Sequence, residues 1–174
     1  NGTVEDYSYS RLNELTNRFA NVLHQLGVSK GDRVFVLAGR IPELYIAALG
    51  TLKNRSVFCP LFSAFGPEPI HTRLELGKAK ALVTTEVLYA RKVAALRSYL
   101  PQLEHVILVG EGGAETDVEG IQDYRRLLAG FAFEADLRLD DEPDVGGLEL
   151  GGHLLPLRQG QDRPEVPDRH ILAV

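Results

Sequence analysis

Side chains that commonly do chemistry are few in this sequence, and none has a spacing that specifies a reaction. The single cysteine, Cys59, lies in the apolar run Val-Phe-Cys-Pro-Leu. A thiol in such a run is more often a small hydrophobic side chain than a nucleophile. Ser63 lies in Phe-Ser-Ala-Phe-Gly and not in the G-x-S-x-G turn of a hydrolase. The histidines share no metal-ligand spacing such as H-x-x-x-H: His24, His71, His105, His153 and His170. These residues by themselves predict no catalytic site and no metal site.

Two further segments contain residue types that bind phosphate in other proteins. Residues 110–113, Gly-Glu-Gly-Gly, lack the G-x-G-x-x-G spacing that brings a helix N-terminus to a pyrophosphate, so we interpret them as a turn. Arg91 and Lys92 lie within a helical stretch, where a basic pair is by default part of a solvated face. Neither segment predicts a binding site without further information.

The segments that must position any site alternate between helical and strand patterns. Residues 8–26 have Leu and Phe at spacings of three and four, with Ser8 or Ser10 as a cap and Gly27 as a stop, which predicts an amphipathic helix. Further helices are predicted at 42–52, 67–76, 86–100 and 121–128, and buried strands at 33–37, 57–61, 81–84 and 105–109. This alternation implies parallel pairing through right-handed crossovers, and hence an α/β fold with a layered, mostly parallel sheet.

The alternating pattern ends near Asp140. Residues 141–174 contain five Gly and four Pro and no aromatic residue, and they have no helix or strand period. We therefore predict an α/β domain over residues 1–140 and an irregular or disordered tail over residues 141–174. Two explanations of this tail stay open. A frameshift near residues 140–145 would account for the lost period and for the absence of Lys after Lys92, and a true tail would look equally disordered.

Composition limits the class of protein. The chain has 174 residues, of which 44% are hydrophobic and 25% charged, and its net charge is −5. The acidic balance argues against a nucleic-acid or anionic-membrane surface, because phosphate binding needs clustered Lys and Arg. No apolar run is long enough for a transmembrane helix and no signal peptide is visible, so the expected location is the cytoplasm. Since Met is absent even at position 1, we expect the chain to be a fragment of a longer reading frame.

Several segments, in order, resemble a known family. Residues 9–20, Tyr-Ser-Arg-Leu-Asn-Glu-Leu-Thr-Asn-Arg-Phe-Ala, and residues 26–34, Leu-Gly-Val-Ser-Lys-Gly-Asp-Arg-Val, resemble the opening of adenylate-forming acyl-CoA synthetases. The similarity continues through 42–53 and 57–61, although residues 54–56 are Asn-Arg-Ser where the family commonly has Ala-Gly-Ala. Residues 62–68 and 73–74 are most similar to the acetate–CoA ligase branch. The resemblance covers residues 5–110 and implies the N-terminal subdomain of the adenylate-forming enzyme fold, incomplete in this chain.

The resemblance also implies a reaction and its cofactors. In that family a carboxylate attacks the α-phosphate of ATP, with Mg²⁺ present, and the thiol of CoA then displaces AMP from the acyl-adenylate. The implied partner is a small carboxylic acid, with acetate first. Carried over to this sequence, the residues that contact CoA would be Phe65, Gly66, Arg91 and Lys92.

No catalytic residue is carried over. The family's phosphate loop, Thr-Ser-Gly-Thr-Thr-Gly-x-Pro-Lys-Gly, is expected shortly after Asp140, where this sequence has no Ser-Gly-Thr cluster and no Lys. We therefore expect the isolated chain to be inactive and to hold no cofactor. Two alternatives remain open at this point: a noncatalytic α/β scaffold or interaction domain, and a truncated gene product without function.

Overall fold

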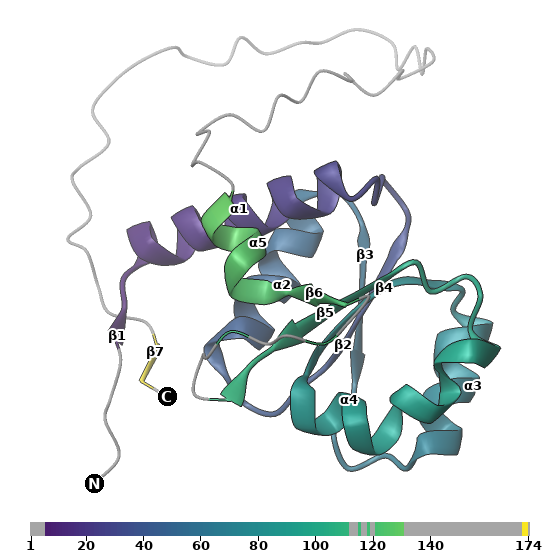
Figure 1. The fold of residues 1–174 in the computed structure, drawn as a ribbon. Helices are drawn as coiled ribbons and strands as arrows, with labels where there is room; N and C mark the ends of the chain where they lie inside the picture. The colour runs from purple at the N-terminus through teal and green to yellow at the C-terminus, as the bar shows by residue number, and fades with distance from the viewer. Residues whose placement is uncertain (1–5, 112–114, 116–117, 119–120, 131–171, 174) are drawn as a thin grey trace, which may run out of the picture.

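The fold is a parallel β-sheet between two layers of helices (Figure 1). The computed structural model of the chain describes residues 6–111, 115, 118, 121–130, 172 and 173. The sheet has five strands in the order β3-β2-β4-β5-β6, and every neighbouring pair is parallel. Its strands are β2 (Arg33–Leu37), β3 (Val57–Leu61), β4 (Ala79–Thr85), β5 (His105–Val109) and β6 (Gln122–Asp123). The predicted α/β class with a layered parallel sheet is confirmed.

Each face of the sheet carries its own hydrophobic core. One layer contains α1 (Tyr9–Gln25), α2 (Pro42–Lys53) and α5 (Tyr124–Gly130), and the other contains α3 (Pro67–Leu76), α4 (Glu86–Lys92) and the 3₁₀ helix η1 (Ala94–Tyr99). Successive strand residues point to opposite faces, so Val34 and Val36 pack in the first core whereas Phe35 and Leu37 pack in the second. The middle residues of β2, β4 and β5 are apolar on both faces because helices cover both faces of the sheet there.

Helix α1 follows directly from local sequence chemistry. The Ser8 hydroxyl accepts a hydrogen bond from the backbone N–H of Arg11 at 3.1 Å and caps the first turn. Phe19 and Leu23 are fully buried on the face that the Leu and Phe spacing predicts. Gly27, with a φ of 73°, supplies the left-handed residue that ends the helix. The predicted helix at 8–26 is confirmed.

Strand β3 differs from the prediction in its burial. Only Leu61 of its five residues is buried, and Val57 and Pro60 are exposed. The apolar run predicts the strand correctly, but β3 lies at the edge of the sheet with β2 as its one neighbour. The position of a strand in the sheet decides how far it is buried. The prediction that residues 57–61 form a buried strand was therefore right about the strand and wrong about its burial.

Two predicted helices have different boundaries in the structure. The helix expected at 86–100 ends at Lys92, and Val93, with a φ of −123°, leads into η1. The larger rise of the 3₁₀ turns carries Leu100 to a fully buried position. The helix expected at 121–128 begins instead at Tyr124, because the Asp123 carboxylate accepts a hydrogen bond from the Arg126 N–H at 2.7 Å and caps the helix there.

The remaining strands are short. β1 (Asp6–Tyr7) pairs antiparallel with β7 (Leu172–Ala173), a pairing that the sequence did not predict. Apart from β7, the predicted tail and its boundary at residue 140 lie outside the described residues. In the described part of the chain, no helix has the length and apolar character needed to cross a bilayer.

Candidate functional site

The carboxyl ends of the parallel strands form the candidate functional region. Parallel α/β sheets bind ligands outside these ends, at the point where the strand order reverses direction. In this sheet the reversal lies between β2 and β4, because the chain passes from β2 to β3 on one side and then to β4 on the other. The loops that follow β2 and β4 must therefore border any ligand bound at this point.

A pocket of about 540 Å³ lies at the reversal, and we call it the switch-point pocket. Its wall comes from the segments after β2, β4 and β5, with contributions from β1 and α5: Tyr7, Ile41, Pro42, Glu43, Thr85, Glu86, Val87, Val109, Gly110, Glu111 and Arg125. Three carboxylates and one guanidinium give the wall an excess of negative charge. Such a wall disfavours a phosphate group and favours a neutral or cationic one.

Tyr124 is buried near this pocket. Its side chain is 4% exposed and its hydroxyl makes no hydrogen bond to the described residues. Burial, followed by the nearby charges of Glu43 and Tyr7, raises the pKa of Tyr124 well above its usual value. The phenol therefore stays neutral and keeps a free hydroxyl. No pattern in the sequence singled out this group, because a tyrosine within a helical pattern is indistinguishable from an ordinary core residue.

A second cluster lies at the carboxyl end of β3, in residues 62–66, which we call the Phe62–Gly66 turn. The Lys92 ammonium, at the end of α4, donates to the carbonyl oxygen of Ser63 at 2.5 Å and to that of Phe65 at 2.8 Å. Two of the predicted site residues, Phe65 and Lys92, are thus brought into contact although they lie 27 positions apart, and the third, Gly66, directly follows Phe65. Arg91, the fourth, is exposed on the preceding position of α4.

The aromatic rings of this turn are also held in place. The Arg73 guanidinium carbon, on α3, lies 4.3 Å from the centroid of the Phe65 ring, a cation–π contact. The rings of Phe62 and Phe65 meet edge to face at 5.6 Å, and Phe62 remains 65% exposed. The sequence identified Arg73 only as part of the family resemblance and missed this contact.

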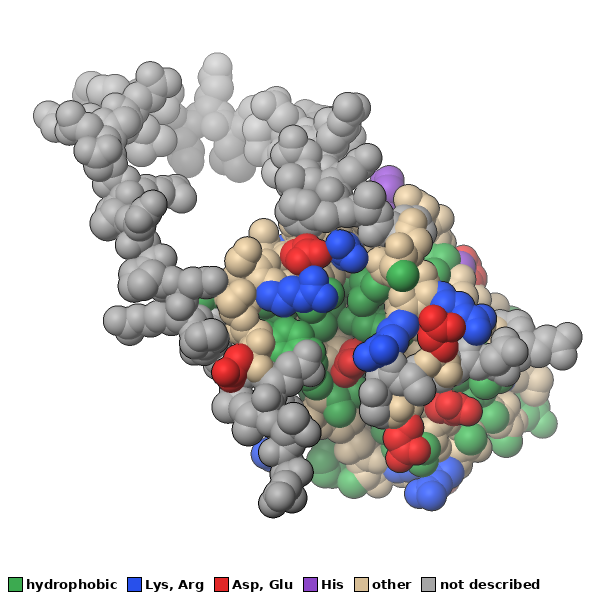
Figure 2. Space-filling model, turned by 60° about the vertical axis from the view of Figure 1, so that its left-hand side comes forward, with side chains coloured by type: hydrophobic (Ala, Val, Ile, Leu, Met, Phe, Trp, Pro, Cys, Tyr) green, Lys and Arg blue, Asp and Glu red, His purple; other side chains and the backbone are tan. Residues whose placement is uncertain are grey.

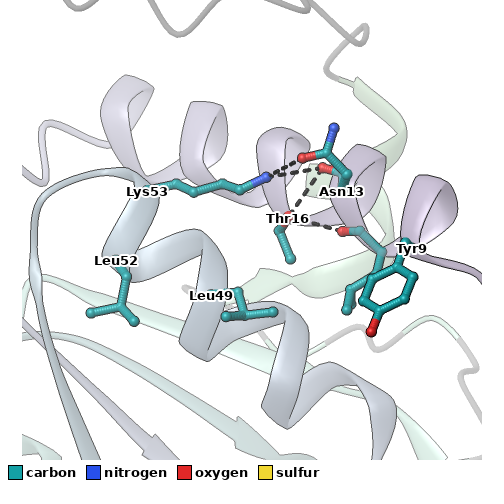
Figure 3. Close-up of a pocket in the computed structure, with 7 residues that line it drawn as sticks. Tyr9, Asn13, Thr16, Leu49, Leu52 and Lys53 are labelled. Carbon is teal, nitrogen blue, oxygen red and sulfur yellow. Dashed lines mark hydrogen bonds between the residues drawn. The ribbon is translucent and has the colours of Figure 1, made fainter. Parts of the chain in front are cut away.

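A third hollow is an open groove on the surface where α1 and α2 pack together (Figure 3). This groove of about 460 Å³ is lined by Tyr9, Leu12, Asn13, Thr16, Leu49, Leu52 and Lys53. The Lys53 ammonium donates to the side-chain oxygens of Asn13 at 2.7 Å and Asn17 at 2.5 Å, and burial lowers its pKa. The side chains of Tyr9, Leu12, Leu49 and Leu52 make much of the described lining apolar. The ammonium of Lys53 is already bound by protein oxygens.

The other side chains considered in the sequence do not form a site. Burial raises the pKa of the Cys59 thiol, more than the charge of Arg33 lowers it, which reduces the reactive thiolate. Among the described residues, no three His, Cys, Asp or Glu side chains are grouped to hold a metal ion. On the face shown in Figure 2, acidic and basic side chains are interspersed, with hydrophobic ones between them.

Comparison with known proteins identifies the family to which this arrangement belongs. A family model described as AMP-binding enzyme matches residues 2–144. The chain belongs to the AMP-binding enzyme family. It is 43% identical over 141 residues to acetyl-coenzyme A synthetase of Bacillus subtilis (strain 168), covering 80% of this chain and 24% of that protein. It is 32% identical over 128 residues to the human mitochondrial acyl-coenzyme A synthetase ACSM1, covering 73% of this chain and 21% of that protein.

Solved structures of AMP-binding enzymes have the same fold. The crystal structure of an acyl-CoA synthetase from Brucella canis superposes with a TM-score of 0.66 at 30% identity, covering 76% of this chain and 23% of that one. An anthranilate CoA ligase, AuaEII, in complex with anthranoyl-AMP superposes with a TM-score of 0.65 at 21% identity over 70% of this chain and 22% of that one, a likeness of fold alone. The chain spans less than a quarter of the length of these relatives.

Proposed function

We propose that this chain is the N-terminal α/β part of an acyl-CoA synthetase. The enzyme activates acetate, or a similar short carboxylic acid, with ATP to an acyl-adenylate and transfers the acyl group to CoA. The observation that carries the proposal is the 43% identity over 141 residues to a protein named acetyl-coenzyme A synthetase. Acetate is our first choice of substrate because that relative carries the name, although two further acetyl-coenzyme A synthetases match at 34% and 31%, which is no nearer than the 32% of ACSM1 and of a crotonobetaine/carnitine–CoA ligase.

In this proposal the chain contributes to CoA binding rather than to adenylation. Phe65 and Gly66 belong to the Phe62–Gly66 turn, Lys92 binds its carbonyl oxygens, and the exposed Arg91 precedes Lys92 on α4. An aromatic ring and a basic pair suit an adenine ring and phosphates. The switch-point pocket, whose described lining has three carboxylates and one guanidinium, repels the phosphates of ATP. ATP and Mg²⁺ are therefore assigned to other parts of the enzyme. A cytoplasmic location completes the proposal.

A chimeric enzyme tests the proposal. The segment of Bacillus subtilis acetyl-coenzyme A synthetase that aligns with this chain is replaced by the corresponding residues of the chain, within 2–144. Acetate-dependent pyrophosphate release and acetyl-CoA formation are then measured. We expect both activities, because the transplanted fold and the CoA-facing turn are supplied intact. The unmodified Bacillus enzyme is the control.

A folded chimera that forms acetyl-adenylate but no acetyl-CoA would contradict the CoA-binding role. A folded chimera without either activity would favour a noncatalytic scaffold. Acid preference is measured separately, on this protein in its natural length, with acetate, propionate and longer acids as substrates. Preference for an acid larger than propionate would contradict the assignment to the acetate branch.

A further inference from the structure

Helix α2 is apolar on the side that faces away from the core as well as on the side that faces it. Its inner side contributes Ile46 and Ala47 to the first hydrophobic core. On the outer side, Tyr45, Leu49 and Leu52 follow one another at spacings of four and three, which places them in one row along the helix, and we call this row the outer stripe of α2. All three are exposed, Leu52 at 57%. A surface helix of a globular protein usually has charged and polar residues on this side.

Helix α1 extends this apolar surface. Tyr9 and Leu12 of α1 line the open groove between the two helices together with Leu49 and Leu52 of α2 (Figure 3). Tyr9 is itself exposed, so the aromatic ring adds to the surface instead of filling the core. Four apolar side chains from two helices thus meet at one groove, and a contiguous exposed apolar surface of this kind marks an interaction site.

Two polar groups of the groove are already bonded within the chain. The Lys53 ammonium donates to the side-chain oxygens of Asn13 and Asn17, and the Thr16 hydroxyl donates to the carbonyl oxygen of Leu12 at 2.8 Å. Covering the groove would leave neither group without a partner, so it would carry little penalty for lost hydrogen bonds. An open groove also does not enclose a small molecule on most sides, as ligand pockets do. Both features favour a protein surface as the occupant.

The length of the relatives indicates where that protein surface comes from. A helix that is hydrophobic on all sides is typical of the interior of a larger protein. The segment that aligns with this chain makes up 24% of the Bacillus subtilis protein and 21% of human ACSM1, so most of such an enzyme lies outside it. The apolar composition of α2 is therefore explained if both of its sides are buried once the rest of the enzyme is present.

We propose that the outer stripe of α2, with Tyr9 and Leu12 of α1, is an internal packing surface that apolar side chains from the rest of the same synthetase cover. The covering polypeptide lies outside the segment that aligns with residues 2–144. The proposal rests on the function proposed above, in that it takes the chain as part of a longer enzyme. The surface belongs to the helix layer of α1, α2 and α5, on the opposite face of the sheet from α3 and α4.

Thiol alkylation of the chimeric enzyme tests this contact. Cys59, the one cysteine of the chain, is replaced by Ser, and a single cysteine is introduced as Leu52→Cys or, as the matched control, as Leu76→Cys. Leu76, at the end of α3 in the opposite helix layer, is 79% exposed. The rate of modification by iodoacetamide is measured at each site by mass spectrometry of its peptide. Each rate is compared with that of the same chimera unfolded in urea.

We expect folding to slow alkylation of Leu52→Cys on the order of tenfold or more, and alkylation of Leu76→Cys by no more than about threefold. The protection of Leu52→Cys should not depend on protein concentration, because the covering surface belongs to the same polypeptide. Protection no greater than that of Leu76→Cys would overturn the proposal. Protection that is lost on dilution would assign the surface to a second copy of the chain and would also overturn it.

A charged substitution gives a second measurement. Leu52→Lys should lower the Tm of the chimera by several degrees, because the covering surface would bury an ammonium against apolar groups. Leu76→Lys, at the more exposed control position, should leave the Tm unchanged. Loss of the folded chimera in Leu52→Lys but not in Leu76→Lys is the same effect at a larger size. Equal Tm values for the two variants would contradict the packing surface.

The outcomes separate this proposal from the proposed function, because alkylation and melting need no substrate. A folded chimera that protects Leu52→Cys but makes no acetyl-CoA supports the packing surface and contradicts the proposed function. A chimera that makes acetyl-CoA and leaves Leu52→Cys unprotected contradicts the packing surface alone. A chimera that does not fold with the segment unmutated contradicts both, since the outer stripe of α2 would then not match the rest of the enzyme.

Discussion

At the residue scale, the turn between α2 and β3 shows how this chain accommodates an unfavourable backbone. Arg55 has a φ of 60°, in the left-handed region, where a non-glycine residue costs about 1–2 kcal/mol. The resembling synthetases commonly have glycine at this position. Its neighbours compensate, because Asn54 Nδ2 donates to the Val28 carbonyl at 2.7 Å and to Ser56 Oγ at 2.9 Å. Ser56 Oγ in turn donates to the Ser29 carbonyl at 3.0 Å, so the turn is tied to the loop after α1.

Arg55→Gly is therefore expected to stabilise the chain. Removing Cβ relieves the left-handed strain, while the added flexibility of the unfolded chain offsets part of the gain, which leaves an increase of about 0.5–1 kcal/mol in the free energy of unfolding. Urea denaturation followed by circular dichroism measures the change. The matched control is Arg40→Gly, an exposed arginine that is not at positive φ, and it should give no increase. Equal effects of the two variants would contradict the strain argument.

Asp32 makes stability depend on pH. Burial alone would raise its pKa, but hydrogen bonds from the Lys80 ammonium at 2.9 Å and the Ser29 N–H at 2.8 Å outweigh burial and hold the pKa below 3.8. A carboxyl with a lowered folded-state pKa contributes stability above its unfolded pKa and loses it as the pH falls through the folded value. The contribution should therefore be complete at pH 6 and should decline below about pH 4.

Asp32→Asn tests this dependence. At pH 6 the free energy of unfolding of the variant should be lower than that of the unmutated chain by about 0.5–1 kcal/mol, which is the usual contribution of a partly exposed ion pair. The difference should shrink as the pH is lowered below 4. In a Lys80→Met background, the same substitution should have a smaller effect at pH 6. A difference independent of pH would show that the carboxylate charge is not what stabilises the turn.

At the element scale, a helix boundary was predicted accurately where a capping residue or a proline close in the sequence sets it. The starts of α1, α2 and α3 are at or next to a capping serine or a first-turn proline, and all three lie within about a residue of the predicted positions. The end of α4 at Lys92 and the start of α5 at Tyr124 were missed. The first coincides with the burial of Val93 and Leu100, which no local pattern reveals. The second needed Asp123 to be recognised as a cap rather than as part of the helix.

The contact between α1 and α2 is set by one glycine. A Cβ at Gly50 would lie 2.8 Å from Phe19 Cδ1 and 2.9 Å from the Thr16 carbonyl oxygen, and the latter is backbone that cannot move aside alone. Gly50→Ala should therefore push the two helices apart and lower the free energy of unfolding by about 1–3 kcal/mol, despite the higher helix propensity of alanine. Gly39→Ala is the matched control, because nothing lies within 4 Å of its added Cβ. Thermal denaturation of both variants distinguishes the outcomes, and a Tm for Gly50→Ala at or above that of the unmutated chain would contradict the close approach.

At the scale of the whole molecule, the sequence predicted the sheet better than the site. Alternation of apolar strands with helices is sufficient for a parallel layered fold, and resemblance was needed to select Phe65, Gly66, Arg91 and Lys92. Neither line of reasoning could separate Lys92, which binds two carbonyls, from Arg91, which remains exposed. Arg73 and Tyr124 were missed as well, since a cation–π contact and a buried hydroxyl depend on which elements pack together. Side-chain partners across the fold are the information that a single sequence lacks.

The negative charge of the switch-point pocket predicts that this chain binds ATP only weakly. A nucleoside triphosphate bound there would face Glu43, Glu86 and Glu111, with Arg125 as the one cation among the described residues of the wall, so its phosphates would meet net repulsion. The chain also has no Lys after Lys92 to supply a phosphate ligand. We therefore expect calorimetric titration of the 174-residue chain with Mg-ATP to give a Kd no tighter than about millimolar, with no acyl-adenylate formed from acetate. The chimeric enzyme in the same titration is the positive control. Micromolar binding by the chain, abolished by Arg125→Met, would contradict the assignment of ATP to other parts of the enzyme and would place it in this pocket.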